Sequence, residues 1–294
     1  MRINYSNGEK TFNIINNILM FMVMTVTLYP LLYVAFASIS KPDLIVQHTG
    51  LLLWPLGFTS DAYKLVFSNP MIPQGYLNTL FYVFAGTALN LVMTIMAAFV
   101  LSRKKFMIRN VMMMVIVFTM FFDGGLIPRY LIVNSIGLFN TRWALIFPVA
   151  MSTFNMILMR TFFMSLPDSL EESAKIDGAS DLTVLLRIIL PLSLPIIAVM
   201  VLFYGVGHWN AWFNAMIYLR TRDLYPLQLI LREILIQSSV QNMMTDLMAG
   251  VDREPIGIII RYATIMVATI PILFVYPFLQ KYFVKGVMIG AIKG

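Results

Sequence analysis

Six long apolar stretches, separated by more polar segments, dominate the pattern of hydrophobic and polar residues along this chain. A transmembrane α-helix needs about 20 mostly apolar residues to cross a bilayer, and each stretch reaches about that length. With ends uncertain by a few residues, the stretches are about 12–39, 77–101, 108–130, 143–163, 192–219 and 256–278. The pattern predicts an all-α, polytopic membrane protein with six transmembrane helices.

Proline and glycine mark a candidate kink or break in the first, third and sixth of these stretches. We expect a kink at Pro30 in the first stretch, and Pro271 and Pro277 lie inside or at the end of the sixth. An Asp-Gly-Gly triplet at 123–125 interrupts the third, so we expect its helix to break there. Such residues are tolerated in membrane helices because neighbouring helices can satisfy the freed backbone groups.

Composition favours a membrane protein over a soluble one. Hydrophobic residues make up 59% of the 294 positions and charged residues 12%, whereas soluble domains average roughly 45–50% and about 25%. A soluble protein of this size would need more polar surface to cover its core. An ordinary cytosolic enzyme and a disordered scaffold are therefore excluded. Because the chain has no cysteine, disulfide bonds, thiol nucleophiles and cysteine-ligated zinc are excluded as well.

The positions of the positive charges predict the orientation in the membrane. Six spans place both termini on one side, together with the connection after the second span, which contains Arg103, Lys104 and Lys105 and no acid. Cytoplasmic loops of membrane proteins carry an excess of Lys and Arg. We therefore expect a multi-pass protein of the cell membrane with cytoplasmic N- and C-termini. The net charge of +7 then reflects topology and not nucleic-acid binding.

No internal repeat, low-complexity tract or separate soluble domain is evident, so we interpret residues 1–294 as a single transmembrane domain. The largest outer loop, about 220–255, contains an apolar stripe at helical spacing. The stripe predicts either a helix lying on the outer end of the bundle or a docking surface for an extracellular partner. Its members are Leu227, Ile230, Leu231, Ile234 and Leu235.

The loop between the fourth and fifth spans predicts two short helices joined by a sharp turn. Ser169 and Glu172 have capping-box spacing at the start of the first helix. Gly178 suits the position after that helix, because glycine readily adopts positive φ. Ser180 or Asp181 can then cap the second helix.

The second of these helices carries an apolar stripe at i, i+3, i+4 and i+7, which must be buried against a neighbour. It packs either under the chain's own bundle or into a groove of a partner protein. The stripe consists of Leu182, Leu185, Leu186 and Ile189.

This loop resembles the EAA loop of permease subunits of ATP-binding-cassette importers. The pattern of that loop is Glu-Ala-Ala, three residues, Gly, nine residues, Ile, one residue, Leu-Pro, and the spacing here matches throughout. Ser173 in place of the first Ala is a mild departure, and Leu185 stands where the sugar branch often has Phe. The resemblance covers about residues 168–191 and assigns ATPase coupling to Glu171, Glu172, Ser173, Ala174, Asp177, Gly178, Ala179, Leu182, Leu185, Ile188 and Pro191.

Three further segments carry the resemblance over most of the chain. The C-terminal tail, 284–294, is similar to that of the maltose-type inner-membrane subunit, whose tail reaches between the ATPase subunits. The segments 123–128 and 208–214 resemble a carbohydrate subgroup of Gram-positive bacteria that is associated with complex oligosaccharides and polysaccharide fragments.

The resemblance implies a type I importer fold and a set of partners. These are two cytosolic ATPase subunits, a homologous second permease, an extracellular solute-binding lipoprotein and an oligosaccharide substrate. Glu172 resembles the acid that pairs with an ATPase arginine, and Gly178 allows the turn that seats the loop. A P-loop needs Gly-x-x-x-x-Gly-Lys-Ser/Thr, which this sequence lacks. We therefore expect no enzyme activity, cofactor or metal in this chain, and ATP with Mg²⁺ on partner subunits.

Several polar and aromatic residues near the outer half of the spans are candidates for a sugar path. Sugars bind to aromatic rings and to amide or carboxylate groups, whereas the alternative roles are contacts between helices and an interfacial aromatic belt. Asn210 and Asn214 are four apart, so we expect them on one helical face. Asp123 has Arg129 as a possible ion-pair partner, unless that arginine only extends to the interface. The candidates are Asp123, Asn155, His208, Trp209, Asn210, Trp212 and Asn214.

Two other classes of protein compete with the importer. An ion-coupled secondary carrier usually has midplane acids and inverted repeats, and neither is evident in this sequence. An integral membrane enzyme acting on lipid-linked glycans would need clustered acid, base or metal-ligand residues at a membrane face. The two histidines, His48 and His208, are far apart in the sequence, so a metal site is not expected.

Overall fold

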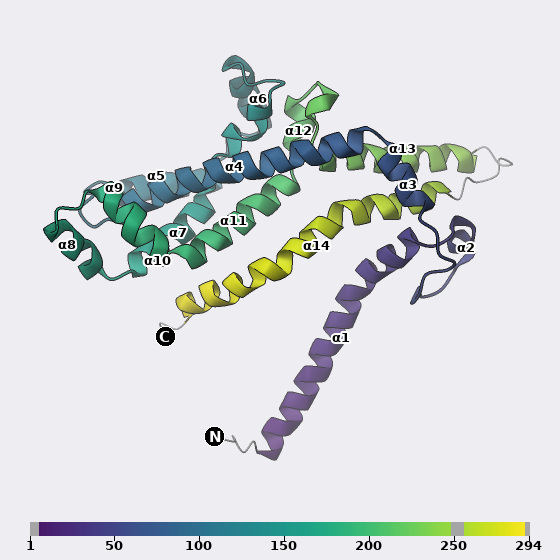
Figure 1. Cartoon of the computed structure of the whole chain (residues 1–294), viewed down its shortest axis with the longest axis horizontal. Coiled ribbons are helices and arrows are strands. Elements are labelled where there is room, and N and C mark those ends of the chain that lie inside the picture. The colour runs from purple at the N-terminus through teal and green to yellow at the C-terminus, as the bar shows by residue number, and fades with distance from the viewer. Residues whose placement is uncertain (1–5, 248–255, 292–294) are drawn as a thin grey trace. The chain divides into compact units, whose positions relative to one another are not determined.

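The computed structural model describes residues 6–247 and 256–291, and these are helices and connecting segments (Figure 1). Within these residues no β-strand forms, apart from one isolated bridge between Ser40 and Phe58. The helices are α1 Asn7–Ser38, α2 Pro42–Gln47, α3 Asp61–Ser68, α4 Met71–Ser102, α5 Arg109–Phe121, α6 Leu126–Ser135, η1 Arg142–Leu145, η2 Phe147–Val149, α7 Thr153–Ser165, α8 Asp168–Ile176, α9 Asp181–Val184, η3 Leu185–Ile189, α10 Leu190–Leu192, α11 Leu194–Trp209, α12 Phe213–Tyr218, η4 Arg222–Leu224, α13 Leu227–Leu247 and α14 Ile256–Ala291.

Three helical segments among the described residues are long and apolar enough to cross a membrane alone: α1, α4 and the part of α14 at Gly257–Val275. Three bent pairs bring the number to as many as six if each pair is one span. The pairs are α5 with α6, bent by 112°, Arg142–Val149 with α7, bent by 50°, and Asp181–Leu192 with α11, bent by 83°. The all-α membrane fold is confirmed, and half of its candidate spans are broken helices.

The break predicted at 123–125 is confirmed. Helix α5 ends at Phe121 and α6 begins at Leu126. Between them Gly125 has φ of 81°, a conformation that glycine adopts without steric cost. Helix α1, by contrast, continues through Pro30, and α14 continues through Pro271 and Pro277.

The described residues fall into two compact units, Met71–Ile230 with Ile270–Gly294 and Met1–Pro70 with Leu231–Thr269. In the first unit, α4 packs along both α7 and α11. The interface buries Phe99 of α4, Met156, Met159 and Phe163 of α7, and Met200 of α11. Lipid tails are as apolar as these side chains, so close packing and hydrogen bonds hold the helices together.

Small and polar residues line the buried face of α4. Its buried positions recur every fourth residue and therefore share one face of the helix. Interfaces between membrane helices are typically rich in such residues, which allow close approach and hydrogen bonding. The series is Asn78, Tyr82, Gly86, Asn90, Thr94 and Ala98.

In the other unit, residues near the end of α1 pack on the start of α14. Ala37, Ile45 and Leu52 form a small apolar cluster with Ile258 and Tyr262 around it. The ring of Tyr33 meets that of Tyr262 edge-on, with centroids 5.9 Å apart. The apolar window of α1 is not buried within its own unit.

The apolar stripe expected in the outer loop lies at the start of α13. Leu227, Ile230 and Leu231 are buried, as is Leu229, which the pattern did not include. Residues 248–255 of this loop lie outside the described residues. The same holds for the last residues of the predicted tail 284–294 and for the side chains of the rest of it.

Candidate functional sites

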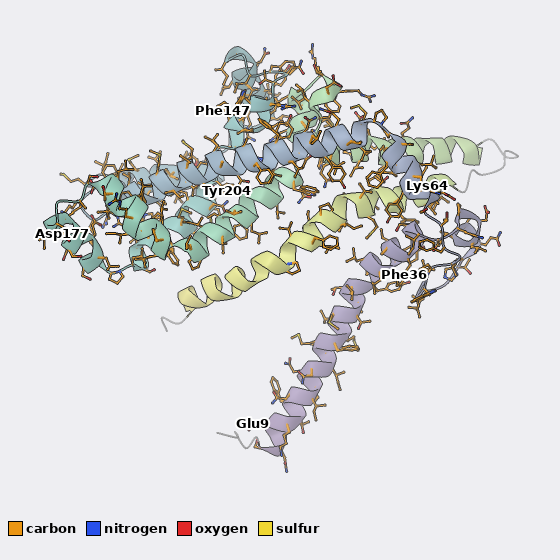
Figure 2. All side chains as sticks on the ribbon, in the orientation of Figure 1. Glu9, Phe36, Lys64, Phe147, Asp177 and Tyr204 are labelled. Atoms are coloured by element: carbon orange, nitrogen blue, oxygen red, sulfur yellow. The ribbon has the colours of Figure 1, made fainter. Side chains whose placement is uncertain are left out.

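The first candidate site is the elbow formed by α8 and α9. Helix α8 ends at Ile176, and Gly178 then adopts φ of 81°, which reverses the chain within a few residues. The turn is closed by a hydrogen bond of 2.9 Å from the Ala179 amide to the Ala174 carbonyl. Asp177 lies at the tip of this hairpin (Figure 2). The predicted pair of short helices with a glycine turn is confirmed.

The two predicted helix caps have different outcomes. The Ser180 hydroxyl accepts a hydrogen bond of 3.2 Å from the Thr183 amide, so this cap of α9 is confirmed. The capping box at Ser169 and Glu172 is wrong, because α8 starts two residues earlier than this box requires and Pro167 occupies its N-cap position. Ser169 is thus already inside the helix.

A network of charged residues connects the elbow to the segment after α4. Glu171 binds Arg103 through one carboxylate oxygen and Lys175 through the other, at 2.6 Å. Lys175 also contacts Asp181 at 3.1 Å, which joins α8 to α9 across the glycine turn. A second pair joins Lys104 to Asp168 at the start of α8. Nothing in the sequence pattern indicated that Arg103 contacts this elbow.

The electrostatics of this network favour its charged form. Partial burial raises the pKa of Glu171, but the hydrogen bonds and charges of Lys175 and Arg103 outweigh this effect and lower it overall. The hydrogen bonds that Lys175 donates to the carboxylates of Glu171 and Asp181 raise its pKa. The elbow is therefore fastened by ionised groups at neutral pH.

The prediction that the apolar stripe of the second helix is buried is only half correct. Leu185 and Ile189 are buried under the bundle, whereas Leu182 is 63% exposed and Leu186 is 53% exposed. The cause is a π-helical turn at Leu185–Ile189, which has more residues per turn than an α-helix and shifts the faces relative to each other. Together with Ile176, which is 86% exposed, the two outward leucines form an apolar surface on the elbow.

The other predicted coupling residues lie around this surface. Three residues are half-buried against the bundle: Ala174, Ala179 and Ile188. Five are exposed: Glu172, Ser173, Asp177, Gly178 and Pro191. No described contact within the chain assigns them a function, so their coupling role stays a prediction.

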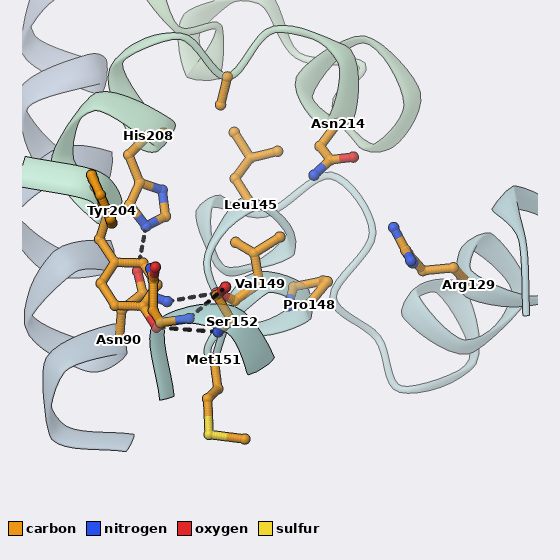
Figure 3. Close-up of a pocket in the computed structure, with 14 residues that line it drawn as sticks. Asn90, Arg129, Leu145, Pro148, Val149, Met151, Ser152, Tyr204, His208 and Asn214 are labelled. Atoms are coloured by element: carbon orange, nitrogen blue, oxygen red, sulfur yellow. Dashed lines mark hydrogen bonds between the residues drawn. The ribbon is translucent and has the colours of Figure 1, made fainter. Parts of the chain in front are cut away.

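The second candidate site is a cavity of about 460 Å³ between α4, α7 and α11, with Arg129 of α6 also lining it (Figure 3). This volume lies within the roughly 300–1,000 Å³ that is typical of small-molecule sites. Its lining combines apolar side chains such as Leu145 and Val149 with amide, hydroxyl and imidazole groups. Arg129 faces the cavity from the side opposite His208, Tyr204 and Asn90.

One wall of the cavity is a connected set of hydrogen bonds. The Asn90 amide donates to the Val149 carbonyl, so its oxygen is free to accept a 2.7 Å bond from Nε2 of His208. The Tyr204 hydroxyl lies 2.6 Å from Thr94 Oγ1 and accepts a 3.1 Å bond from the Ser152 amide. These bonds join α4, α11 and the segment before α7, which makes the wall rigid.

Three of the seven predicted sugar-path residues line this cavity: Asn155, His208 and Asn214. The expectation that Asn210 and Asn214 share a helical face is wrong, because α11 ends at Trp209 and α12 begins only at Phe213. Asn210 instead donates a 3.0 Å hydrogen bond to the Val206 carbonyl.

The remaining predicted residues are not part of the cavity lining. Trp209 packs against Tyr76 with ring centroids 6.2 Å apart, and Trp212 meets Phe213 edge-on. Asp123 forms a 2.7 Å ion pair with Arg129, so the possible pairing of these two residues is confirmed. The part that each of the seven takes in transport stays a prediction.

Sequence reasoning missed Asn90, Ser152 and Tyr204 as cavity residues. For Asn90 a signal was available, because an amide in the middle of an apolar stretch must find a polar partner. For Ser152 and Tyr204 the sequence offers no such signal, since hydroxyl groups are common in membrane helices.

The fold and these two sites define a helical membrane protein with a polar cavity in its bundle and an elbow outside it. The comparisons agree. The chain is 42% identical over 289 residues to the protein LplC of Bacillus subtilis, with 98% of this chain and 97% of the relative covered. It is also 42% identical to the polygalacturonan/rhamnogalacturonan transport system permease protein YtcP of Bacillus subtilis, with 94% and 96% covered.

A solved structure has the same fold. A bacterial ATP-binding-cassette transporter involved in the import of the acidic polysaccharide alginate matches with a TM-score of 0.83 and 32% identity, covering 96% of this chain and 99% of that one. No family model matches the chain. The chain belongs to the permease subunits of ATP-binding-cassette sugar transporters. This family assignment favours a transporter permease over the secondary carrier and the membrane enzyme.

Proposed function

We propose that this chain forms half of a pathway that carries an oligosaccharide or a polysaccharide fragment into the cell. A homologous second permease completes the pathway, two cytosolic ATPase subunits drive it, and an extracellular solute-binding lipoprotein delivers the substrate. The chain itself carries out no catalysis and holds no cofactor, whereas ATP and Mg²⁺ bind to the partner subunits.

The observation that carries this proposal is the similarity to YtcP along nearly the whole chain. The name of that relative describes transport of polygalacturonan and rhamnogalacturonan, and the alginate transporter matches over almost its whole chain as well. Both relatives handle polymers of sugars, which supports a sugar oligomer or polymer fragment as the substrate here.

We propose further that the elbow docks on an ATPase subunit. Its exposed surface combines apolar side chains, Ile176, Leu182 and Leu186, with the acidic residues Glu172 and Asp177. A protruding helix with such a face suits a groove in a partner protein. Closure of the ATPases on binding ATP then moves the elbow and biases the bundle between inward- and outward-facing states.

The orientation follows from the same proposal. The elbow and its partner residues Arg103 and Lys104 lie on the cytoplasmic side, in accordance with the excess of Lys and Arg expected there. The N- and C-termini are then cytoplasmic, and the loops at 40–70 and 220–255 face outward.

Affinity purification of the chain from its native membrane tests the proposal. We expect mass spectrometry to identify a second permease and an ATPase in the complex, and we expect that complex, reconstituted with the binding protein, to take up a sugar oligomer only with ATP. A homo-oligomer that lacks an ATPase and takes up solute along an ion gradient would contradict the proposal and restore the secondary carrier.

A further inference from the structure

The cavity contains polar groups that the protein itself leaves without hydrogen bonds. Asn155 is only 5% exposed, yet its side-chain amide has no hydrogen-bond partner among the described residues. The side chain of Asn214 likewise has none within the described part of the chain. Asn214 is only half-buried, and neither amide is among the fully enclosed polar atoms that lack a partner. Both amide groups are therefore accessible from the cavity and available to a ligand or to water.

Most of the other polar groups in the lining already make hydrogen bonds within the protein. The Asn90 side chain bonds to His208 Nε2 and to the Val149 carbonyl, and the Tyr204 hydroxyl bonds to Thr94 and to the Ser152 amide. They therefore form a fixed wall, and the ligand-binding capacity lies with Asn155 and Asn214. A primary amide both donates and accepts, which suits the hydroxyl groups of a sugar.

The charge in the cavity has one sign. Arg129 is the one formally charged side chain among the described residues that line it, and no Asp or Glu is among them. Figure 3 shows Arg129 facing the cavity from the side opposite His208. The planar fork of a guanidinium group matches a carboxylate and favours an anionic ligand. Asp123, which does not line the cavity, already neutralises part of this charge from outside the lining.

The ion pair with Asp123 leaves this capacity in place. Only Nη2 of Arg129 is bonded to Asp123, at 2.7 Å, and a guanidinium has five N–H donors. The side chains of Arg129 and Asp123 are 44% and 62% exposed, and ion pairs that the protein does not enclose are weak. A ligand carboxylate can therefore bind beside Asp123 or displace it.

We propose that this cavity is a binding subsite for one acidic sugar unit, in which Asn155 and Asn214 hold hydroxyl groups and Arg129 holds the carboxylate. The inference rests on the proposed function and names its substrate class: oligosaccharides that contain uronic acid residues. It also assigns the site to this permease subunit, whose own helices supply all three groups.

Uptake of matched acidic and neutral probes tests the subsite. The complete importer, with its second permease, ATPases and binding protein, is reconstituted in liposomes and supplied with oligogalacturonates and oligomannuronates or with their methyl esters. The ester removes the negative charge and keeps the hydroxyl groups. We expect the wild type to take up an acidic probe with a kcat/KM at least about tenfold above that of its ester, the effect of one charge-assisted hydrogen bond.

Variants separate the two kinds of contact. Arg129→Gln should raise the KM for the acidic probe about tenfold and leave that for the ester nearly unchanged, with Arg129→Lys between the two. Asn155→Leu and Asn214→Leu should weaken uptake of both probes, because both retain the hydroxyl groups. Arg220→Gln and Asn134→Leu, which lie outside the cavity lining, are the matched controls. ATPase activity of each purified complex shows that it has assembled.

Two kinds of result would contradict the proposal, and they have different consequences for the proposed function. If only neutral probes are taken up, or if Arg129→Gln affects acid and ester equally, the acidic subsite is wrong and the importer stands. If no probe is taken up with ATP, the proposed function fails and the subsite fails with it.

Discussion

At the scale of single residues, a glycine sets the distance between two helices. Gly86 of α4 lies against the imidazole ring of His208, and a Cβ atom at this position would overlap that ring. Because His208 is held by its bond to Asn90, it has little freedom to move away. The smallest residue is thus required at this helix contact, as at many contacts between membrane helices.

We predict that Gly86→Ala destabilises the protein by about 1–3 kcal/mol, the usual cost of overpacking a tight contact. Gly205→Ala is the control, since a Cβ atom there meets its neighbours at 3.9 Å or more. Thermal unfolding of the purified variants in detergent measures the difference. An unchanged Tm for Gly86→Ala would show that the ring of His208 can move aside.

A second residue-scale prediction concerns the turn of the elbow. Gly178 has φ of 81° and open space around it, so only the backbone conformation restricts this position. Gly178→Val should lower ATP-dependent uptake strongly without preventing membrane insertion, because the left-handed region costs β-branched residues more than the roughly 1–2 kcal/mol of an ordinary residue. Gly178→Asn should retain most of the uptake, since asparagine tolerates this region. Equal uptake by both variants would argue against a role for the turn.

At the scale of secondary-structure elements, ionic contacts position α8 relative to α4 and α9. Glu171 is the centre of this arrangement because it binds Arg103 and Lys175 at once. We predict that Glu171→Gln weakens the docking of α8 by about 1–3 kcal/mol, the range of a hydrogen bond between charged groups. Glu172→Gln, one residue further along on the exposed side of α8, is the matched control. Amide hydrogen exchange should become faster in α8 of the first variant only.

The same contacts predict how the elbow responds to pH. The pKa of Glu171 is lowered in the folded state, so its contribution is complete above the ordinary value of about 4.3 and is lost as pH falls through the folded pKa. The pKa of Lys175 is raised, so its contribution is complete below about 10.4 and is lost as pH rises through the folded pKa. Protection of α8 should therefore be constant between about pH 5 and 10. In Glu171→Gln the loss of protection at acid pH should be much smaller, and an unchanged loss would mean that another group causes it.

At the scale of the whole molecule, the proposed orientation can be measured directly. The chain contains no cysteine, so every introduced thiol is the only one present. We predict that Lys105→Cys reacts with an impermeant maleimide only from the cytoplasmic side and Lys64→Cys only from outside. Labelling of both from the same side would overturn the six-span topology.

The sequence determined the composition class, the apolar stretches, the break at 123–125 and the elbow with its glycine turn. These features depend on short-range causes: the length needed to cross a bilayer, the φ that glycine allows and the capping by Ser180. The predicted burial of the apolar stripe on the second helix of the elbow was wrong for Leu182 and Leu186, because a π-helical turn changed the periodicity locally.

Only the tertiary structure decided which polar residues meet. Asn90, Ser152 and His208 are far apart along the chain and come together because α4, α7 and α11 pack on one another. The pairing of Arg103 with Glu171 depends in the same way on two loops that lie on the same side of the bundle. A periodic pattern tells which face of a helix is buried, but not which helix lies opposite, because long-range contacts depend on how all the helices pack at once.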